Sequence, residues 1–167
     1  TARMQRASSD GADLLVCPEL SLCAYYPGDL FEDAAFLRAM QRALDTLLEA
    51  SARWPALVTV IGTARPNPGV GKPLHNALLA IRDGRIAAEY YKQLLPTYGI
   101  FDEGRHFEPG PPGACTLTIA GCKVATVRLP PARLRGALRS GAIDAMAMEA
   151  AESEKDVYAL PLDAAGK

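Results

Sequence analysis

The sequence predicts an α/β fold in which helices cover a β-sheet. Residues 13–17 and 57–63 are two short apolar runs, and the second is rich in β-branched side chains, which is typical of buried strands. Between them, residues 33–54 place apolar side chains three and four positions apart, the spacing of an amphipathic helix. A buried strand, a helix and a second buried strand in this order indicate a parallel pair within a helix-covered sheet.

The first strand is preceded by a helix and followed by a carboxylate. Residues 1–10 have the pattern of the last turns of a helix that Gly11 ends, so we expect an earlier strand to be missing at the N-terminus. Glu19 comes directly after the first strand, at the edge where parallel sheets open their ligand crevice. It is therefore a candidate site residue, and the alternative is an acid that caps a helix or lies in a loop.

Two turn-rich segments and a hairpin follow. Residues 21–30 are predicted to be loop, and residues 65–72, with two prolines and two glycines, a turn or surface loop. Residues 75–81 and 85–91 are expected to be strands, because Asp83-Gly84 between them is a strong hairpin signal.

Lys92 lies just past the hairpin, where the apolar pattern stops. A lysine at the end of a strand is commonly a solvated edge residue. Residues 96–103, however, place aromatic side chains in a turn-rich loop without the periodicity of a core element. This arrangement favours a pocket wall, with Lys92 as its charged group.

The remainder of the chain yields further expected elements. They are a rigid connector over 107–115, a second hairpin over 115–120 and 122–127, a helix over 132–140, a strand over 143–148 and a polar tail over 149–167.

Composition and charge limit the classes of function. The chain has 167 residues, 49% of them hydrophobic, which fits a single domain with a closed core. A net charge of −1, from 18 basic and 19 acidic residues, argues against a nucleic-acid or membrane-surface partner. No apolar run is long enough to cross a bilayer and the first residues lack a signal-peptide core, so we expect a cytoplasmic protein.

The four cysteines do not form a recognisable framework. Cys17, Cys23, Cys115 and Cys122 have no CxxC spacing, and a chain of this size does not need disulfide bonds to stabilise its core. We therefore expect reduced thiols and no metal site.

Three stretches carry a resemblance to a known family. They read GADLLVCPELSLCAYYPGDLF, GKPLHNALLAIRDGRIAAEYYKQLLPTYGIFDEGRHFEPG and AGCKVATV. They resemble the amidohydrolase domain of the carbon-nitrogen hydrolase (nitrilase) superfamily, and are most similar to the glutaminase domain of glutamine-dependent NAD synthetase. The likeness covers roughly residues 11–145. It implies a four-layer α-β-β-α sandwich, so that residues 1–167 would be one partial domain, incomplete at both ends.

The resemblance also implies catalytic roles. The family uses a Glu-Lys-Cys triad, in which Glu19 matches the general base and Lys92 the residue that stabilises the oxyanion. Tyr98 and Phe101 match aromatic residues of the glutamine pocket. Glu103 is a candidate for the additional carboxylate that many members place near the lysine.

The nucleophile of the triad does not match. The family pattern places its cysteine at Leu129 or, with a slip of one, at Arg128, and Pro130-Pro131 stand where an acidic pair would follow. Cys122 lies at the other end of the same strand, about 20 Å away at ~3.3 Å per residue. The two cysteines that flank the PEL motif match no nucleophile position. The alternatives are a chain without a nucleophile, or residues missing from the sequence between 127 and 132.

Three functions remain open. The chain is the glutaminase portion of a glutamine-dependent NAD synthetase that supplies ammonia from glutamine, an inactive nitrilase-fold pseudo-enzyme that binds or oligomerises, or an amidase for another small amide. The resemblance implies no cofactor for the amidase domain. ATP and a deaminated NAD precursor would belong to a synthetase domain in cis or trans, which we expect to be absent from this chain. A homo-oligomer is implied as well.

Overall fold

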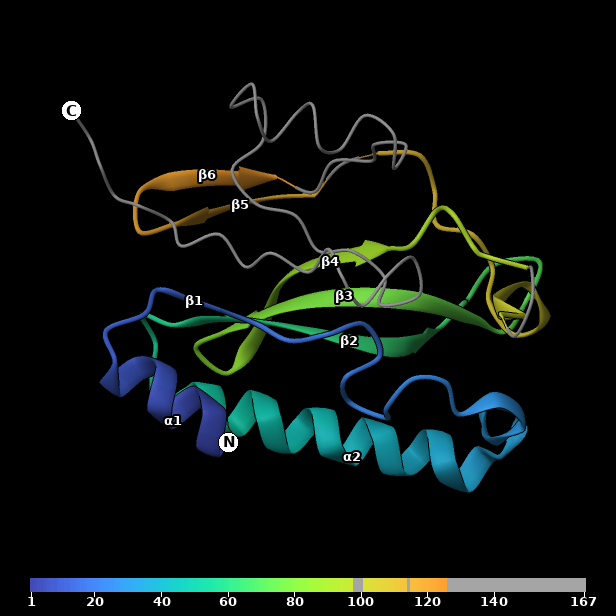
Figure 1. Ribbon diagram of the computed structural model, residues 1–167, viewed down its shortest axis with the longest axis horizontal. Helices are drawn as coiled ribbons and strands as arrows, with labels where there is room; N and C mark the ends of the chain where they lie inside the picture. Colours follow the sequence, from blue (N-terminus) through green and yellow to red (C-terminus); the bar gives the residue numbers. More distant parts are fainter. Residues whose placement is uncertain (98–100, 114, 126–167) are drawn as a thin grey trace. The chain divides into compact units, whose positions relative to one another are not determined.

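The computed structural model describes residues 1–97, 101–113 and 115–125 (Figure 1). The elements are, in chain order, α1 (Ala2–Ser9), β1 (Leu14–Val16), the 3-10 helix η1 (Gly28–Glu32), α2 (Ala34–Ser51), β2 (Val58–Pro66), β3 (Leu74–Arg82), β4 (Arg85–Tyr91), the 3-10 helix η2 (Glu103–Arg105), β5 (Thr116–Ile119) and β6 (Cys122–Ala125). Strands β1 to β4 form one sheet in that order, and β5 pairs with β6 in a separate hairpin. This confirms the predicted α/β class.

The first two strands pair as predicted. β1 runs parallel to β2, with Leu14 opposite Val58, while the β2–β3 and β3–β4 pairs are antiparallel. The prediction of full burial is wrong for β1, since the Val16 side chain is 53% exposed. β1 lies at the edge of the sheet, so only one of its sides has a strand neighbour within the described residues.

Side chains that alternate along the strands build a separate core on each face of the sheet. Helices α1 and α2 lie along one face (Figure 1), where Leu44 of α2 packs with Ile61 and Leu79. On the opposite face, Val58 and Ala80 pack against β5. The described residues therefore form a helix layer, a sheet, and a hairpin on the far side of the sheet.

Helix α2 is fixed at both ends by side chains. The carboxylate of Asp33 accepts a hydrogen bond from the Ala35 amide at 2.7 Å, which satisfies a free N–H of the first turn. At the other end, the Ser51 hydroxyl donates to the Leu48 carbonyl and accepts from the Gly84 amide, both within 2.8 Å. The helix thus ends at Ser51, which binds the β3–β4 turn, and not at residue 54 as predicted.

The predicted loop over 65–72 begins too early. β2 continues through Arg65 and Pro66, which pair with His75 and Leu74 of β3. Proline is tolerated at the end of a strand, because the missing N–H group would have to donate a hydrogen bond only in the interior of the sheet. Arg65 also forms an ion pair with Glu89 of β4, at 2.9 Å from Nε to Oε1.

The hairpin of β3 and β4 is confirmed and contains an irregularity that the sequence did not indicate. Asp83 and Gly84 have φ angles of +49° and +75°, as a type I′ turn requires. Ile81 pairs with Ile86, but Ala80 pairs with Ala88. One extra residue, Ala87, therefore bulges from β4 between these pairs.

The second hairpin is confirmed for the strands β5 and β6. The end of that hairpin, the helix over 132–140, the strand over 143–148, and positions 128–131 lie outside the described residues, as does Tyr98. None of the helices in the described part of the chain has the length and apolar character that a membrane crossing requires.

Candidate active site

Glu19 lies in a loop that is held against strand β2. The Leu22 amide donates to the Gly62 carbonyl at 3.1 Å. A Cβ atom on Gly62 would lie 2.3 Å from the backbone nitrogen of Leu20, so only glycine permits the loop to approach this closely. The close approach sets the position of Glu19 relative to the sheet.

Lys92 is placed by backbone hydrogen bonds on both sides. Its amide donates to the Asn76 carbonyl of β3, and its carbonyl accepts from the Gly110 amide, each at 2.8 Å. A Cβ on Gly110 would come within 2.3 Å of the Tyr91 carbonyl oxygen, so glycine is needed here too. Lys92 is therefore held between β3 and the connector that follows η2.

Glu103 begins η2 and has no exposed surface. Its amide donates to the Pro96 carbonyl at 3.2 Å, and its carbonyl accepts from the Phe107 amide at 2.9 Å. Phe107 is 1% exposed and packs edge-on against Phe31, with ring centroids 5.0 Å apart. This aromatic packing anchors the segment that carries the carboxylate.

The three charged groups meet at the lysine ammonium. Lys92 Nζ lies 2.9 Å from Glu19 Oε1 and 3.0 Å from Glu103 Oε2. The side chains of Lys92 and Glu19 are 19% and 23% exposed, so both are partly accessible to solvent. Two carboxylates thus share one cation in a largely buried setting.

Two neutral side chains complete the arrangement. The Asn76 amide nitrogen donates to Glu19 Oε1 and, at 3.4 Å, to Glu103 Oε2. The Tyr25 hydroxyl donates to Glu103 Oε1 at 3.0 Å. The fully buried carboxylate therefore accepts hydrogen bonds from three different side chains, the third being Lys92.

Burial dominates the electrostatics of Glu103. It raises the pKa of this carboxyl, the nearby charge of Lys92 lowers it, and the charge of Glu19 raises it again. Burial also raises the pKa of Tyr25, and the adjacent Glu103 carboxylate raises it further, so this phenol stays protonated and can donate.

Of the residues singled out from the sequence, the structure brings together Glu19, Lys92 and Glu103. The Phe101 ring lies at 6.1 Å from that of Tyr25, measured between centroids, beside the carboxylate cluster. Tyr98, Arg128 and Leu129 lie outside the described residues. A carboxylate next to an ammonium can act as a general base beside a cation that stabilises a developing negative charge.

Sequence reasoning missed Asn76 and Tyr25. Asn76 is a polar residue in the largely buried strand β3, directly before its apolar run, and it is 3% exposed. Such a residue is a signal in itself, because a buried amide requires hydrogen-bond partners. Tyr25 gave no comparable signal, because its contact with Glu103 joins loops that are 78 positions apart in the sequence.

Two cysteines lie close to the PEL motif, and neither has the environment of a reactive thiol. Burial raises the pKa of Cys23 to about 11, and it also raises the pKa of Cys17. The Cys23 sulfur lies 3.5 Å from the Leu20 carbonyl oxygen. Both thiols are thus protonated at neutral pH, and the protonated form is a poor nucleophile.

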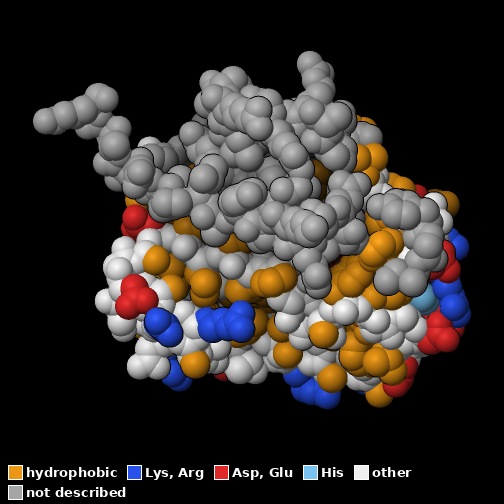
Figure 2. Space-filling view, in the orientation of Figure 1, with side chains coloured by type: hydrophobic (Ala, Val, Ile, Leu, Met, Phe, Trp, Pro, Cys, Tyr) orange, Lys and Arg blue, Asp and Glu red, His pale blue; other side chains and the backbone are white. Residues whose placement is uncertain are grey.

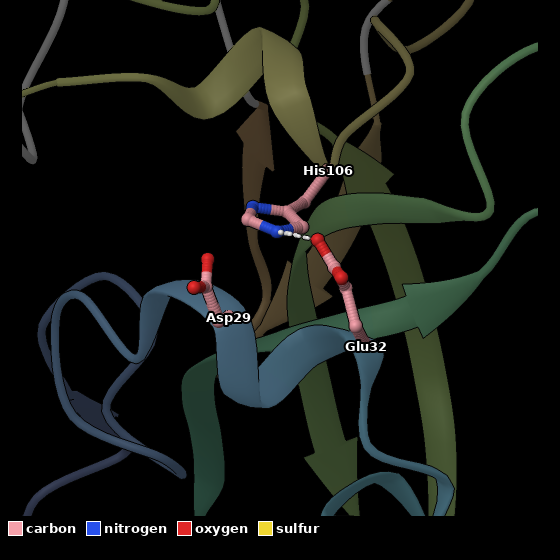
Figure 3. Close-up of side chains that lie close together, drawn as sticks. All are labelled: Asp29, Glu32 and His106. Atoms are coloured by element: carbon pink, nitrogen blue, oxygen red, sulfur yellow. Dashed lines mark hydrogen bonds and ion pairs between the residues drawn. The ribbon is translucent and has the colours of Figure 1, made fainter.

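A second polar cluster lies at one end of the visible surface, where acidic and basic side chains gather around a histidine (Figure 2). In the close-up, Asp29 and Glu32 of η1 approach His106, whose Nε2 lies 3.3 Å from Glu32 (Figure 3). Arg105 reaches both carboxylates, at 2.9 Å from Asp29 and 3.0 Å from Glu32. The hydrogen bonds from His106 and Arg105 lower the pKa of Glu32. The guanidinium supplies the positive charge here, so the cluster is an ion-pair network.

A cavity of about 240 Å³ lies between α2 and β2, and its lining includes Leu37, Gln41 and Ala64. None of the residues that line it belongs to the Glu19–Lys92–Glu103 cluster. It is a groove of the helix layer, separate from the charged site.

Comparison with known proteins identifies relatives of this sequence. The chain is 39% identical over 111 residues to the glutamine-dependent NAD(+) synthetase of Synechocystis sp.. The aligned region covers 64% of this chain and 19% of the relative. It is 36% identical over 117 residues to the glutamine-dependent NAD(+) synthetase of Xanthomonas campestris pv. campestris, and this alignment covers 70% of this chain and 20% of the relative. The chain therefore spans about a fifth of the length of these relatives.

Solved structures share its fold. A glutamine-dependent NAD+ synthetase from Acinetobacter baumannii, in complex with ADP, superposes with a TM-score of 0.64 at 27% identity, covering 74% of this chain and 22% of that one. An amidase from Nesterenkonia sp. AN1 gives a TM-score of 0.60 at 23% identity, covering 74% and 45%. The second likeness shows the nitrilase fold alone.

The family model described as carbon-nitrogen hydrolase matches residues 2–161, which include the loop of Glu19, the strand end at Lys92 and the turn of Glu103. This match over more than half of the sequence shows that the chain belongs to the carbon-nitrogen hydrolase family.

Proposed function

We propose that the chain forms the glutaminase part of a glutamine-dependent NAD synthetase, which releases ammonia from the side-chain amide of glutamine. The observation that carries this proposal is the Lys92 ammonium held within 3.0 Å of both the Glu19 and Glu103 carboxylates. The similarity of the sequence to NAD synthetases supports glutamine as the substrate.

In the proposed reaction, Glu19 is the general base and Lys92 stabilises the oxyanion that forms on the amide carbonyl. Glu103 holds the lysine from its other side and takes no part in bond breaking. Phe101 and Tyr98 line the pocket for the glutamine side chain. A thiol supplied from another position attacks the amide carbonyl carbon and gives its proton to Glu19. The C–N bond then breaks as Glu19 returns this proton to the leaving nitrogen, which releases ammonia and leaves a thioester. Water, deprotonated by Glu19, attacks the thioester to give glutamate and the free thiol.

The nucleophile is the unmatched part of the proposal. The two positions expected to hold it are occupied by Leu129 and Arg128, and neither side chain can attack an amide. Hydrolysis by this chain therefore needs a thiol from another position.

The other components follow from the same proposal. No cofactor is required at the amidase site, because an ammonium and two carboxylates supply the acid-base and electrostatic chemistry. ATP and a deaminated NAD precursor would bind a synthetase domain, in cis or trans, that uses the ammonia. We further propose a cytoplasmic homo-oligomer.

A second candidate is a catalytically inactive nitrilase-fold module for binding or oligomerisation. It is favoured by Arg128 and Leu129, which stand at the expected nucleophile positions, and by the protonated thiols of Cys17 and Cys23. A third candidate is an amidase for another small amide, since the charged cluster by itself does not select glutamine.

The test is ammonia release from glutamine, with acetamide as a second substrate. We expect release that falls roughly 10²-fold or more in Lys92→Ala, because the oxyanion loses its stabilising charge. Lys72→Ala, which changes an exposed lysine of the β2–β3 loop, serves as the matched control and should retain the wild-type rate.

The outcomes separate the three candidates. Turnover of glutamine that depends on Lys92 rules out the inactive module. Turnover of acetamide, with no turnover of glutamine, favours the small-amide amidase. A folded chain with no ammonia release from either substrate overturns the enzymatic proposals.

A further inference from the structure

Asn76 is a buried amide at the centre of the charged cluster. It is the third residue of strand β3, directly before the apolar run ALLAI, and is 3% exposed. Burying an amide in an apolar strand is unfavourable unless its hydrogen-bonding groups find partners. Its Nδ2 donates to Glu19 Oε1 and to Glu103 Oε2, so one side chain connects the two carboxylates.

The backbone of the same residue holds the lysine. The Asn76 carbonyl accepts the hydrogen bond from the Lys92 amide at 2.8 Å. Asn76 therefore contacts all three charged residues, Lys92 through its main chain and both carboxylates through its side chain. The carboxylates come from separate loops, one after β1 and one in η2, and β3 is the rigid element between them.

The electrostatic problem at this place is the excess of negative charge. Glu103 is faced by Lys92 from the end of β4, by Glu19 from the loop after β1, and by Tyr25 and Tyr26 from the loop before η1. One ammonium is shared between two carboxylates, so a neutral donor that reaches both of them stabilises their ionised forms without adding charge.

We propose that Asn76 is a positioning residue of the site, whose amide group holds the Glu19 and Glu103 carboxylates on either side of Lys92 and favours the ionised form of Glu103. The role of Asn76 in the reaction rests on the proposed function, but its holding of the two carboxylates does not. In this role Asn76 acts through the two carboxylates.

The test is a pH titration of the Glu103 carboxyl carbon by 13C NMR in the 167-residue chain, without glutamine. Asn76→Leu keeps a side chain of similar size but removes both N–H donors. We expect the proton affinity of Glu103 to rise roughly tenfold, because the charged form loses a hydrogen bond. The control is Thr59→Val, at a β2 side chain that is 2% exposed and not in contact with the cluster; it should leave the titration unchanged.

A second measurement guards against simple loss of folding. The free energy of unfolding is compared for Asn76→Leu, Glu103→Gln and the double variant. If Asn76 acts through the carboxylates, its substitution costs less in the Glu103→Gln background than in the wild type. Additive losses, or a Glu103 titration in Asn76→Leu that equals the wild type, overturn the proposal. Because neither measurement uses glutamine, a chain without glutaminase activity still tests it.

Discussion

Glu103 combines complete burial with three hydrogen-bond donors, and the balance between them determines how it titrates. Burial disfavours its charged form, whereas Lys92 and Tyr25 favour that form. The net effect is a raised pKa, which means that the folded protein holds the proton more tightly than the unfolded chain does.

This raised pKa makes stability depend on pH in a defined direction. As the pH rises above 4.5, the ordinary value for this carboxyl, the unfolded chain releases the proton first, so the folded state loses stability until the pH passes the folded-state pKa. Glu103→Gln cannot titrate. The wild-type free energy of unfolding should therefore fall relative to that of the variant across this window and run parallel above it.

Urea unfolding at closely spaced pH values measures this difference. Glu49→Gln, at an exposed position of α2, controls for the loss of one carboxylate. A difference between wild type and Glu103→Gln that is constant from pH 4 to 8 would contradict the prediction.

At the residue scale, the sequence pointed to Glu19 and Lys92 because each stands where a regular pattern ends, and the family resemblance pointed to Glu103. The partners of these residues were harder to find. Asn76 was hidden by the strand that surrounds it, and Tyr25 reaches Glu103 only through the folded path of its loop. A contact between loops depends on tertiary packing, which local periodicity does not encode.

At the scale of elements, the loop that carries Glu19 depends on one glycine of β2. Gly62→Ala would place a Cβ atom 2.3 Å from the backbone nitrogen of Leu20, closer than any real contact allows. Because backbone must move to relieve this contact, we expect a loss of about 1–3 kcal/mol in the free energy of unfolding. Displacement of Glu19 from Lys92 should follow.

Chemical denaturation checks the stability, and a crystal structure of the variant checks the distance between Glu19 and Lys92. Gly69→Ala is the matched control, since its new Cβ would meet only the Asn67 side chain, at 3.2 Å in an exposed loop. Equal stability of the two variants would show that the loop adapts at no cost.

The elements themselves were largely predictable, and their ends were not. Strand pairing, the amphipathic α2 and the Asp83-Gly84 turn follow from periodicity and turn chemistry. The end of α2 at Ser51 depends instead on its hydrogen bond to the amide of Gly84, and the extension of β2 through Pro66 depends on pairing with β3. Both are decided by a partner strand or turn distant in sequence.

At the scale of the whole molecule, the second hairpin covers the face of the sheet that the helices leave open. Ile119 of β5 is 7% exposed and packs with Val58 and Ala80. Ile119→Ala should therefore lower the free energy of unfolding by about 2–4 kcal/mol through lost burial and a residual cavity.

Thermal and urea unfolding measure this effect. Thr118→Ala alters the neighbouring, exposed position of the same strand and should change stability by less than about 0.5 kcal/mol. Similar losses for the two variants would show that β5 does not seal this face of the sheet.

The order of strands and helices read from the sequence predicted a helix-covered sheet, and the family resemblance predicted the nitrilase fold, which the structural comparisons confirm. The extra residue of β4 was invisible to both. Side chains of antiparallel partners share a face of the sheet, so the register beyond the bulge decides which residue stands opposite Asn76. If β4 kept the register of the Ile81–Ile86 pair, with no bulge at Ala87, that residue would be Tyr91, and the lysine would point to the other face. The bulge shifts the pairing of the rest of β4 by one residue, and the meeting of the ammonium with its two carboxylates depends on that shift.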